Sequence, residues 1–233
     1  MNITVNPAIF TEFDNPRIGI TVLKNIDNNV MLDLSDDFSV LAANIQAQYG
    51  PQTITEIPKI AAWRQAYRQF GAKPKDYPSS IESLLKRVAK GGNFWGINPL
   101  VDIYNYISLK HILPAGGEDI DKMIGNLELT YASATEKAVR VLGRDADEAP
   151  KDGEVIYKDA EGTICRRWNW REVSRTILTT DTTNCVIVFE ALNPVTLDEL
   201  KEAQRELGEL VEKYCGGSYE HHILTSENPE ITV

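Results

Sequence analysis

The chain has no apolar run near the roughly 20 residues that a helix needs to cross a bilayer, so we expect no membrane-spanning segment. Its opening residues, MNITVNP, lack the basic and then apolar pattern of a secretory signal peptide. The three cysteines, Cys165, Cys185 and Cys215, are widely spaced and match no metal-binding pairing. Such cysteines are typical of buried side chains in a reducing compartment, so we expect a cytoplasmic protein without membrane attachment.

Histidine and the common catalytic motifs are also scarce. His111, His221 and His222 are the only histidines, and their spacing fits no zinc pattern. The chain lacks a Gly-x-Ser-x-Gly elbow, a P-loop, a Gly-x-Gly-x-x-Gly fingerprint and a His-Glu-x-x-His helix. We therefore expect neither a metal nor a cofactor, and the best-known hydrolase, nucleotidase and dehydrogenase classes are disfavoured.

Charge is present in quantity but is distributed unevenly. The net charge is −10, yet residues 59–90 carry eight basic and only two acidic side chains. An acidic protein does not coat nucleic acid indiscriminately, but a local basic island can direct one polyanion to one face. The alternative is that these residues form the solvated outer faces of two helices.

The pattern of apolar residues and turn signals predicts an α+β fold. We expect early helices over Ser35–Gln48, from Pro58 to Gly71, from a Ser79–Glu82 capping box to Gly91, and from the cap Asn98 to Leu109. We expect strands at Gly19–Leu23, in a hairpin turning at 159–162 and in "CVIVFEAL", followed by a closing helix from Thr196 to Gly216. No linker or repeat divides the sequence, so residues 1–233 are expected to form a single compact domain, with helices mainly in the N-terminal half packed on a mixed or antiparallel sheet.

A line of polar residues crosses the otherwise apolar helix "NPLVDIYNYISL". Asn98, Asp102 and Asn105 are spaced by four and three, which places them on one helical face. Either they cap the helix and tie down neighbouring loops, or they form the polar wall of a pocket. In the second case Gly116 and Gly117 would form a loop at its floor, where missing side chains leave room for a ligand.

The segment "RRWNWREVSRT" is a second candidate. As a strand it would place Trp168 and Trp170 on one face with Arg166 and Glu172. Two indoles beside a carboxylate could line a pocket for an aromatic or cationic group. The alternative is a sheet face packed on a helix.

These segments carry a resemblance to a known family. From Ala62 to about Leu192 the chain resembles the B3/B4 domain of the bacterial phenylalanyl-tRNA synthetase beta subunit, which edits mischarged tRNA, and more closely the free-standing proteins made of that domain alone. The matching stretches are "FGAKPKDYPSSIESLLKRV", "INPLVDIYNYISL", "LPAGGEDIDKMIG", "GEVIYKD" and "TTNCVIVFEAL". No synthetase core accompanies them, so aminoacylation is not expected.

The resemblance implies an editing pocket formed by the Asn98–Leu109 helix and the segment after it. By the same matching, Glu172 falls near the glutamate that recognises the tyrosine hydroxyl in the family, and Thr182 borders the pocket. The synthetases have a histidine where this sequence has Gly116. Ester hydrolysis would then depend on a water oriented by backbone groups and the substrate's own hydroxyl, or on Glu172 as a base.

Our leading hypothesis is a trans-acting module that binds aminoacyl-tRNA and hydrolyses a mischarged ester. Glu172 would act in catalysis, and the pocket would be lined by Asn98, Asp102, Asn105, Gly116, Gly117, Trp168, Trp170 and Thr182. The expected phosphate contacts are Arg64, Arg68, Lys73, Lys75, Lys86 and Arg87. The alternative is a non-catalytic binder of RNA, of a free amino acid or of another small metabolite.

Overall fold

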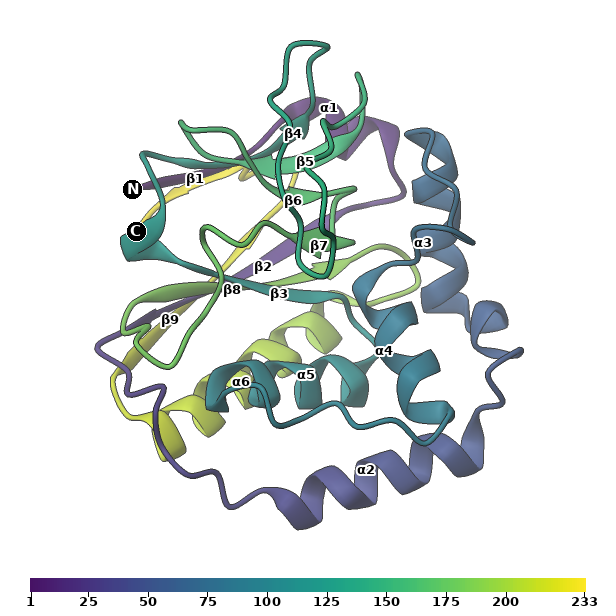
Figure 1. The fold of residues 1–233 in the computed structure, drawn as a ribbon, viewed down its shortest axis with the longest axis vertical. Coiled ribbons are helices and arrows are strands. Elements are labelled where there is room, and N and C mark those ends of the chain that lie inside the picture. Colours follow the sequence, from purple (N-terminus) through teal and green to yellow (C-terminus); the bar gives the residue numbers. More distant parts are fainter.

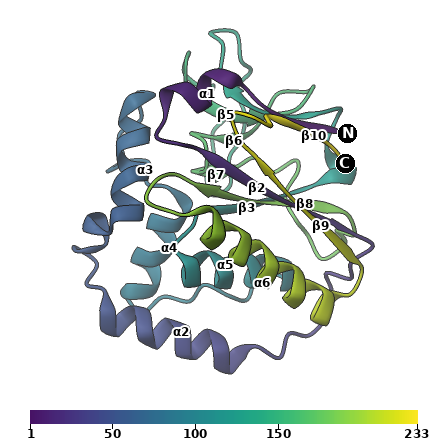
Figure 2. The same ribbon diagram turned by 180° about the vertical axis from the view of Figure 1, so that it is seen from behind.

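A computed structural model describes residues 1–233 as two packed β-sheets with helices beneath and beside them (Figures 1 and 2). The early helices are α1 (Pro7–Glu12), α2 (Ser35–Gln48), α3 (Pro58–Gln69), α4 (Ser80–Ala89) and α5 (Pro99–His111), and α6 (Leu197–Cys215) closes the fold. Short 3₁₀ turns occur at Ile54–Glu56 and Ile120–Lys122. No helix is both long and apolar enough to cross a membrane.

The four-stranded sheet is antiparallel throughout. Its order is β3 (Ala115–Asp119), β8 (Cys185–Ala191), β2 (Arg17–Lys24) and β9 (Ser218–Leu224). All seven residues of β8 are buried. The reason is visible in Figure 1: α5 and α6 cover one face of this sheet, and the other sheet covers the opposite face. A strand buried on both faces reads as a continuous apolar run, as "CVIVFEA" does.

The six-stranded sheet is mixed. Its order is β10 (Glu230–Thr232), β1 (Asn2–Val5), β4 (Leu127–Tyr131), β5 (Val155–Lys158), β6 (Thr163–Arg166) and β7 (Arg171–Glu172). Only β1 and β4 run parallel. Because β1 pairs with β10, the two chain termini lie side by side (Figure 2). The α+β class is confirmed, with the strands divided between two sheets.

Two apolar cores hold these layers together. One lies between the four-stranded sheet and the helices α2, α4, α5 and α6, with α2 as the outermost layer. The other fills the space between the two sheets and includes Trp63 and Tyr67 of α3. The four-stranded sheet thus contributes one face to each core, which fixes the spacing of everything built between the sheets.

Local signals account for most helix boundaries. Asn98 caps α5 by accepting a hydrogen bond from the Val101 nitrogen, and Thr196 and Glu199 form the expected capping box of α6. Only half of the predicted Ser79–Glu82 box forms. Ser79 caps α4, but the Glu82 carboxylate turns to Arg64 and Lys86 instead of to the Ser79 nitrogen.

Two local predictions were wrong. The segment 166–172 is not a continuous strand, because Arg167 and Trp168 have φ of 51° and 63° and form a turn between β6 and β7. The turn removes the expected alternation of faces: Arg166 is fully buried against Glu154, and Trp168 is fully buried in the core between the sheets. Gly116 and Gly117 lie in strand β3, paired with β8, and not in a loop.

Candidate functional site

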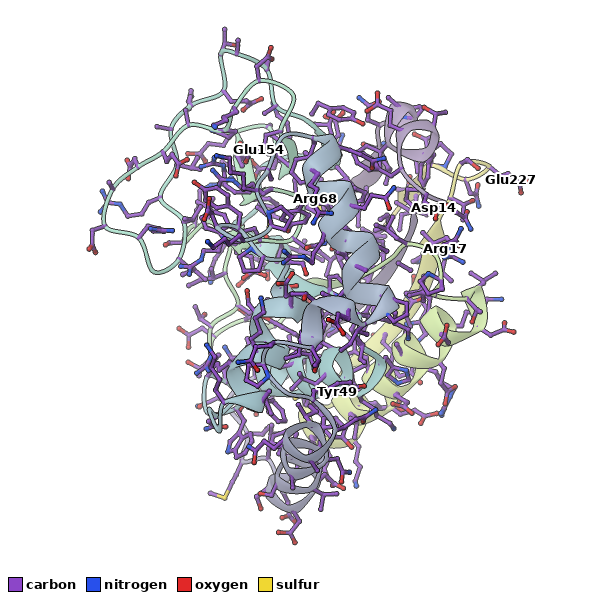
Figure 3. The ribbon with its side chains drawn as sticks, turned by 90° about the vertical axis from the view of Figure 1, so that its right-hand side faces the viewer. Asp14, Arg17, Tyr49, Arg68, Glu154 and Glu227 are labelled. Atoms are coloured by element: carbon purple, nitrogen blue, oxygen red, sulfur yellow. The ribbon has the colours of Figure 1, made fainter.

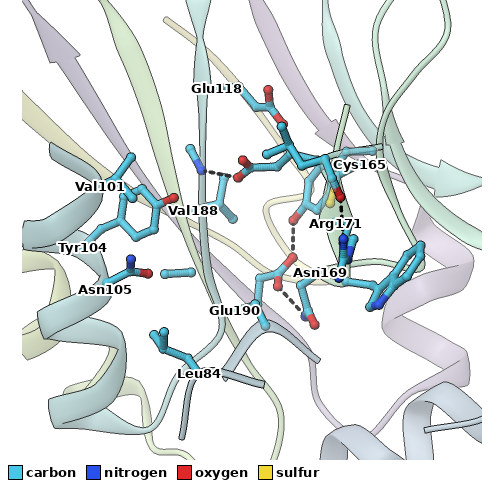
Figure 4. A pocket seen from close by; sticks show the side chains of 18 of the residues that line it. Leu84, Val101, Tyr104, Asn105, Glu118, Cys165, Asn169, Arg171, Val188 and Glu190 are labelled. Atoms are coloured by element: carbon cyan, nitrogen blue, oxygen red, sulfur yellow. Dashed lines mark hydrogen bonds between the residues drawn. The ribbon is translucent and has the colours of Figure 1, made fainter. Parts of the chain in front are cut away.

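A cavity of about 340 Å³ lies between the two sheets, beside α4 and α5. Figure 4 shows this interior cavity from close by. The four-stranded sheet supplies Gly116 and Glu118 from β3, and Val188 and Glu190 from β8. Gly116 pairs directly with Val188, so alternate residues of both strands face the cavity.

The six-stranded sheet and the two helices supply the other walls. Tyr157 and Cys165 come from β5 and β6, Arg171 and Glu172 come from β7, and residues 168–170 come from the turn before β7. The helical wall consists of Ser80, Leu84 and Arg87 from α4, and Val101, Tyr104 and Asn105 from α5. Arg87, Ile97 and Leu142 are exposed to solvent and also line the cavity, so they mark its mouth.

Six of the predicted pocket residues line this one cavity. They are Asn105, Gly116, Gly117, Trp168, Trp170 and Glu172. The two glycines have different surroundings. A Cβ on Gly116 would lie 3.1 Å from Glu172 Oε1, whereas a Cβ on Gly117 would lie 2.6 Å from Leu178 Cδ1 and 2.7 Å from Ile187 Cδ1. Gly116 therefore keeps the space beside Glu172 open, while Gly117 allows close packing against the core behind β3.

Asn98, Asp102 and Thr182 do not line the interior cavity. Asn98 is committed to capping α5, and the Asp102 carboxylate accepts hydrogen bonds from the Gly96 and Ile97 nitrogens at 2.7 and 3.1 Å. These two residues border a separate surface hollow beside residues 30–38. Thr182 is buried and donates to Asp119 Oδ2 at 2.7 Å. The sequence left open that Asn98 and Asp102 cap the helix and anchor a neighbouring loop, and the structure has this arrangement.

Glu172 is the only predicted catalytic residue, and its carboxylate has one hydrogen-bond donor. Its Oε1 accepts from the Gly117 nitrogen at 3.1 Å. Burial raises the pKa of Glu172 to about 7, although the Gly117 N–H favours the ionised form. A carboxyl group with this pKa is divided between its acid and base forms near neutral pH, which suits a general base.

Two further carboxyl groups of the cavity were not identified from the sequence. Glu190 Oε1 accepts from the Tyr157 hydroxyl at 2.7 Å, and Glu190 Oε2 accepts from Asn169 Nδ2 at 2.5 Å (Figure 4). The Tyr67 hydroxyl of α3 in turn donates to Asn169 Oδ1 at 2.9 Å. Burial raises the pKa of Glu190 to about 7 as well.

Glu118 is the second of these carboxyl groups. It is only 6 % exposed, and its Oε2 has no hydrogen-bond partner. Burial and the neighbouring Glu172 raise its pKa well above the ordinary value. A signal for Glu190 was present in the sequence, because it is the one charged residue in an otherwise apolar strand, and a buried charge is rare without a purpose. The orientation of Glu118 depends on the pairing of β3, which no local pattern encodes.

Cations gather on the turn side of the cavity. The guanidinium of Arg167 lies 3.7 Å from the centre of the Tyr77 ring and 4.5 Å from that of Trp170. The Arg171 and Arg144 guanidiniums lie 5.3 and 5.8 Å from Trp170. Trp170 therefore acts as a stacking surface for arginines. Arg87 and Arg171 also line the cavity itself.

The predicted phosphate contacts divide into two groups. Arg64 and Lys86 both bind Oε1 of the fully buried Glu82, at 2.7 and 2.5 Å, so these two cations are already paired. Arg68, Lys73, Lys75 and Arg87 are exposed and form no ion pair. Figure 3 shows Arg68 on α3, on the side of the molecule turned toward the viewer.

No group of His, Cys, Asp and Glu side chains is placed to hold a metal ion. His111 Nε2 lies 2.9 Å from Glu206 on α6, away from the cavity. The three cysteines are buried and unpaired.

Comparison with known proteins identifies the family. Residues 62–216 match the profile of the B3/4 domain, so the chain belongs to the B3/4 domain family. The match extends beyond the expected core and includes α6. A search of curated protein sequences found no match.

The chain is similar in part to solved structures. One of them is an N-terminal fragment of the phenylalanyl-tRNA synthetase beta subunit from Pyrococcus horikoshii, with 13 % identity and a TM-score of 0.45. The alignment covers 93 % of this chain and 49 % of the fragment, so the chain spans about half the length of that fragment.

Proposed function

We propose that this protein binds aminoacyl-tRNA, takes the aminoacyl group into the interior cavity and hydrolyses its ester bond. Membership of the B3/4 family and the resemblance to the synthetase editing domain support the tRNA part of this proposal. The observation that carries the chemical part is Glu172, a carboxyl group inside an amino-acid-sized cavity with a pKa near 7 and no cationic partner. Such a module would act in cytoplasmic translation quality control.

The proposed reaction uses one water molecule. The Glu172 carboxylate removes a proton from the water as its oxygen attacks the ester carbonyl carbon. The bond from that carbon to the ribose oxygen then breaks, and the ribose oxygen recovers a proton. The products are a free amino acid and an uncharged tRNA. Because an aminoacyl ester is an activated ester, a general base worth about 10²–10⁴-fold is sufficient assistance.

The approach of the tRNA follows the exposed cations. Arg87 stands at the mouth of the interior cavity on α4, while Arg68, Lys73 and Lys75 are exposed on and just after α3. These unpaired side chains replace the original six-residue set as the favoured phosphate contacts, because Arg64 and Lys86 are occupied by Glu82. Repulsion by the acidic remainder of the surface would confine the RNA to this side.

The test is incubation of the protein with a panel of correctly and incorrectly charged tRNAs, following loss of the ester. At least one mischarged tRNA should be deacylated, at a rate that rises with pH up to about 7 as Glu172 ionises. Glu172→Gln should lower that rate about 100-fold or more while tRNA binding is retained. Undiminished turnover in this variant would remove Glu172 from the reaction, and no ester loss with any tRNA would refute deacylation.

A non-catalytic binder of RNA, of a free amino acid or of a related small metabolite is the second candidate. It is favoured by the absence of histidine from the cavity lining, since the carboxyl groups alone are also suited to holding a ligand. Thermal denaturation with amino acids and with uncharged tRNA separates a binder of small molecules from a binder of RNA. A ligand that binds the native state raises the apparent stability of the protein. Stabilisation without ester loss would select the binder.

A further inference from the structure

Glu118 is a buried carboxyl group of the cavity that forms no ion pair, and its Oε2 has no hydrogen-bond partner. Thr176 and Arg175 are the neighbours that favour its ionised form, and it lies on the cavity face of β3 together with Gly116. Several buried carboxylates elsewhere in the protein are matched by cations, whereas Asp102 is held by two backbone N–H groups. Glu82 binds Arg64 and Lys86, and Glu154 binds Arg166. Burial disfavours the ionised form of Glu118, and a cation bound against it in the cavity would favour that form, so the cavity space beside Glu118 suits a positively charged group.

The other two carboxyl groups of the cavity have no cationic partner either. Glu190 is bound by a phenol and an amide, and Glu172 by a backbone N–H. Each carboxylate offers about four acceptor positions, so both retain capacity for a further donor. The two arginines that line the cavity form no ion pair with these carboxyl groups. Arg87 is exposed at the mouth, and Arg171 donates to the Leu142 carbonyl oxygen at 2.5 Å. The cavity is therefore positive at its mouth and acidic inside.

The chemistry of the lining selects an organic cation over a metal ion. The acidic side chains are not arranged to ligate a metal. The walls between them are aromatic and aliphatic, with Tyr104, Tyr157 and Trp168 in the lining. Ring faces attract ammonium and guanidinium groups, and they pack against the methylenes that carry such groups. The volume of about 340 Å³ accommodates one amino-acid side chain.

Resting on the proposed function, we propose that the aminoacyl group bound by this protein has a cationic side chain, an amine or a guanidinium, which Glu118 receives. The α-ammonium group is common to all aminoacyl esters and has three donors, so one carboxylate is enough to hold it. The remaining carboxyl groups of the lining are available to a second positive charge. The basic mouth would meanwhile receive the phosphates of the RNA end.

The sharpest test uses two amino-acid amides that differ in a single charge. L-Lysinamide and L-norleucinamide share the α-ammonium group and the aliphatic chain, and only lysinamide has an ε-ammonium group. Calorimetric titration of the wild-type protein should show at least tenfold tighter binding of L-lysinamide. L-Tyrosinamide should bind no better than L-norleucinamide. Equal affinities for the matched pair, or a preference for L-tyrosinamide, would overturn the inference without any variant.

Glu118→Gln assigns the effect to one residue. The variant keeps the shape of the side chain and removes its charge, so the preference for L-lysinamide should fall at least tenfold while L-norleucinamide binding stays unchanged. An unchanged preference in a folded variant would overturn the role of Glu118. Thermal denaturation of the unliganded variant verifies that it is folded.

The deacylation assay separates this inference from the proposed function. Hydrolysis of lysyl and arginyl esters in preference to leucyl and tyrosyl esters supports both. Equal hydrolysis of all four esters overturns the cationic specificity and leaves the deacylase intact. Tight binding of L-lysinamide with no hydrolysis of any ester supports the cationic specificity and overturns the deacylase. The cavity would then be a site that binds cationic amino acids without turnover.

Discussion

Glu172 Oε1 accepts a hydrogen bond from the Gly117 nitrogen at 3.1 Å, and this contact joins the edges of the two sheets. Glu172 belongs to β7, the last strand of the six-stranded sheet, and Gly117 belongs to β3, the last strand of the four-stranded sheet. The residue proposed as the base is thereby held at the junction of two rigid elements. This arrangement is favourable for catalysis, because a reactive group must be fixed to within a fraction of an ångström.

The same junction predicts the effect of a single methyl group. Gly116→Ala places a Cβ about 3.1 Å from Glu172 Oε1, which forces the carboxylate to move. The expected result is a loss of up to about tenfold in deacylation rate, because the carboxylate must shift by a fraction of the displacement of about 1 Å that costs about 100-fold. Gly50→Ala is the matched control, because its Cβ would have no neighbour closer than 3.8 Å. Equal rates for both variants would show that the position of Glu172 is unimportant.

Arg64 and Arg68 stand one turn apart on α3 and should behave differently. Arg64→Ala removes one of the two partners of the fully buried Glu82 and should lower the free energy of unfolding by about 2 kcal/mol, since Lys86 remains. Arg68 is exposed and unpaired, so Arg68→Ala should change the free energy of unfolding by less than about 0.5 kcal/mol. Urea denaturation measures both values. Combining Arg64→Ala with Glu82→Ala should cost less than the sum of the two single changes, because the buried charge is then absent.

Arg64 also illustrates how far the sequence could be interpreted. The local signals were sufficient for the caps of α5 and α6, because a cap depends on residues three positions apart. Ion pairing was not readable, since Arg64 and Glu82 are 18 residues apart on different helices. The sequence therefore shows the surplus of basic residues in this segment, but not that Arg64 and Lys86 are paired with Glu82.

The cavity was predictable in part for a similar reason. Its glycines and Trp168, Trp170 and Glu172 drew attention as unusual residue types. Glu118 and Glu190 share the cavity only because β3 pairs with β8 over a separation of about 70 residues, and such pairing follows from the global packing of the sheets. The turn at Arg167 and Trp168 could not be foreseen, because positive φ is uncommon for these residue types.

Binding of tRNA should depend on the unpaired cations alone. Reversing the charge of Arg68, Lys73 or Arg87 to Glu should weaken binding and reduce the slope of log K against log salt by about one for each lost phosphate contact. Lys201→Glu is the control, because Lys201 is exposed on α6 and forms no ion pair. Fluorescence anisotropy with labelled tRNA at several salt concentrations gives both quantities. Equal slopes in all four variants would exclude this face as the RNA surface.

Glu190 should make the stability of the protein depend on pH. Burial raises its pKa from 4.5 to about 7 in the native state, and its partners Tyr157 and Asn169 are both uncharged. Between these two pH values the native state holds a proton that the unfolded chain has released. The stabilisation that comes from this proton is complete at low pH and is lost as the pH rises through about 7.

Glu190→Gln isolates this contribution. Urea denaturation of the wild type and the variant at pH 5 and pH 8 gives four free energies of unfolding. The wild type should lose on the order of 2 kcal/mol relative to the variant between the two pH values. Any fixed cost of rearranging the hydrogen bonds to Tyr157 and Asn169 is the same at both pH values and cancels in this comparison. A difference that stays constant with pH would mean that Glu190 keeps the same charge in the folded and unfolded chain, and that the interior cavity is less sheltered from water than its geometry implies.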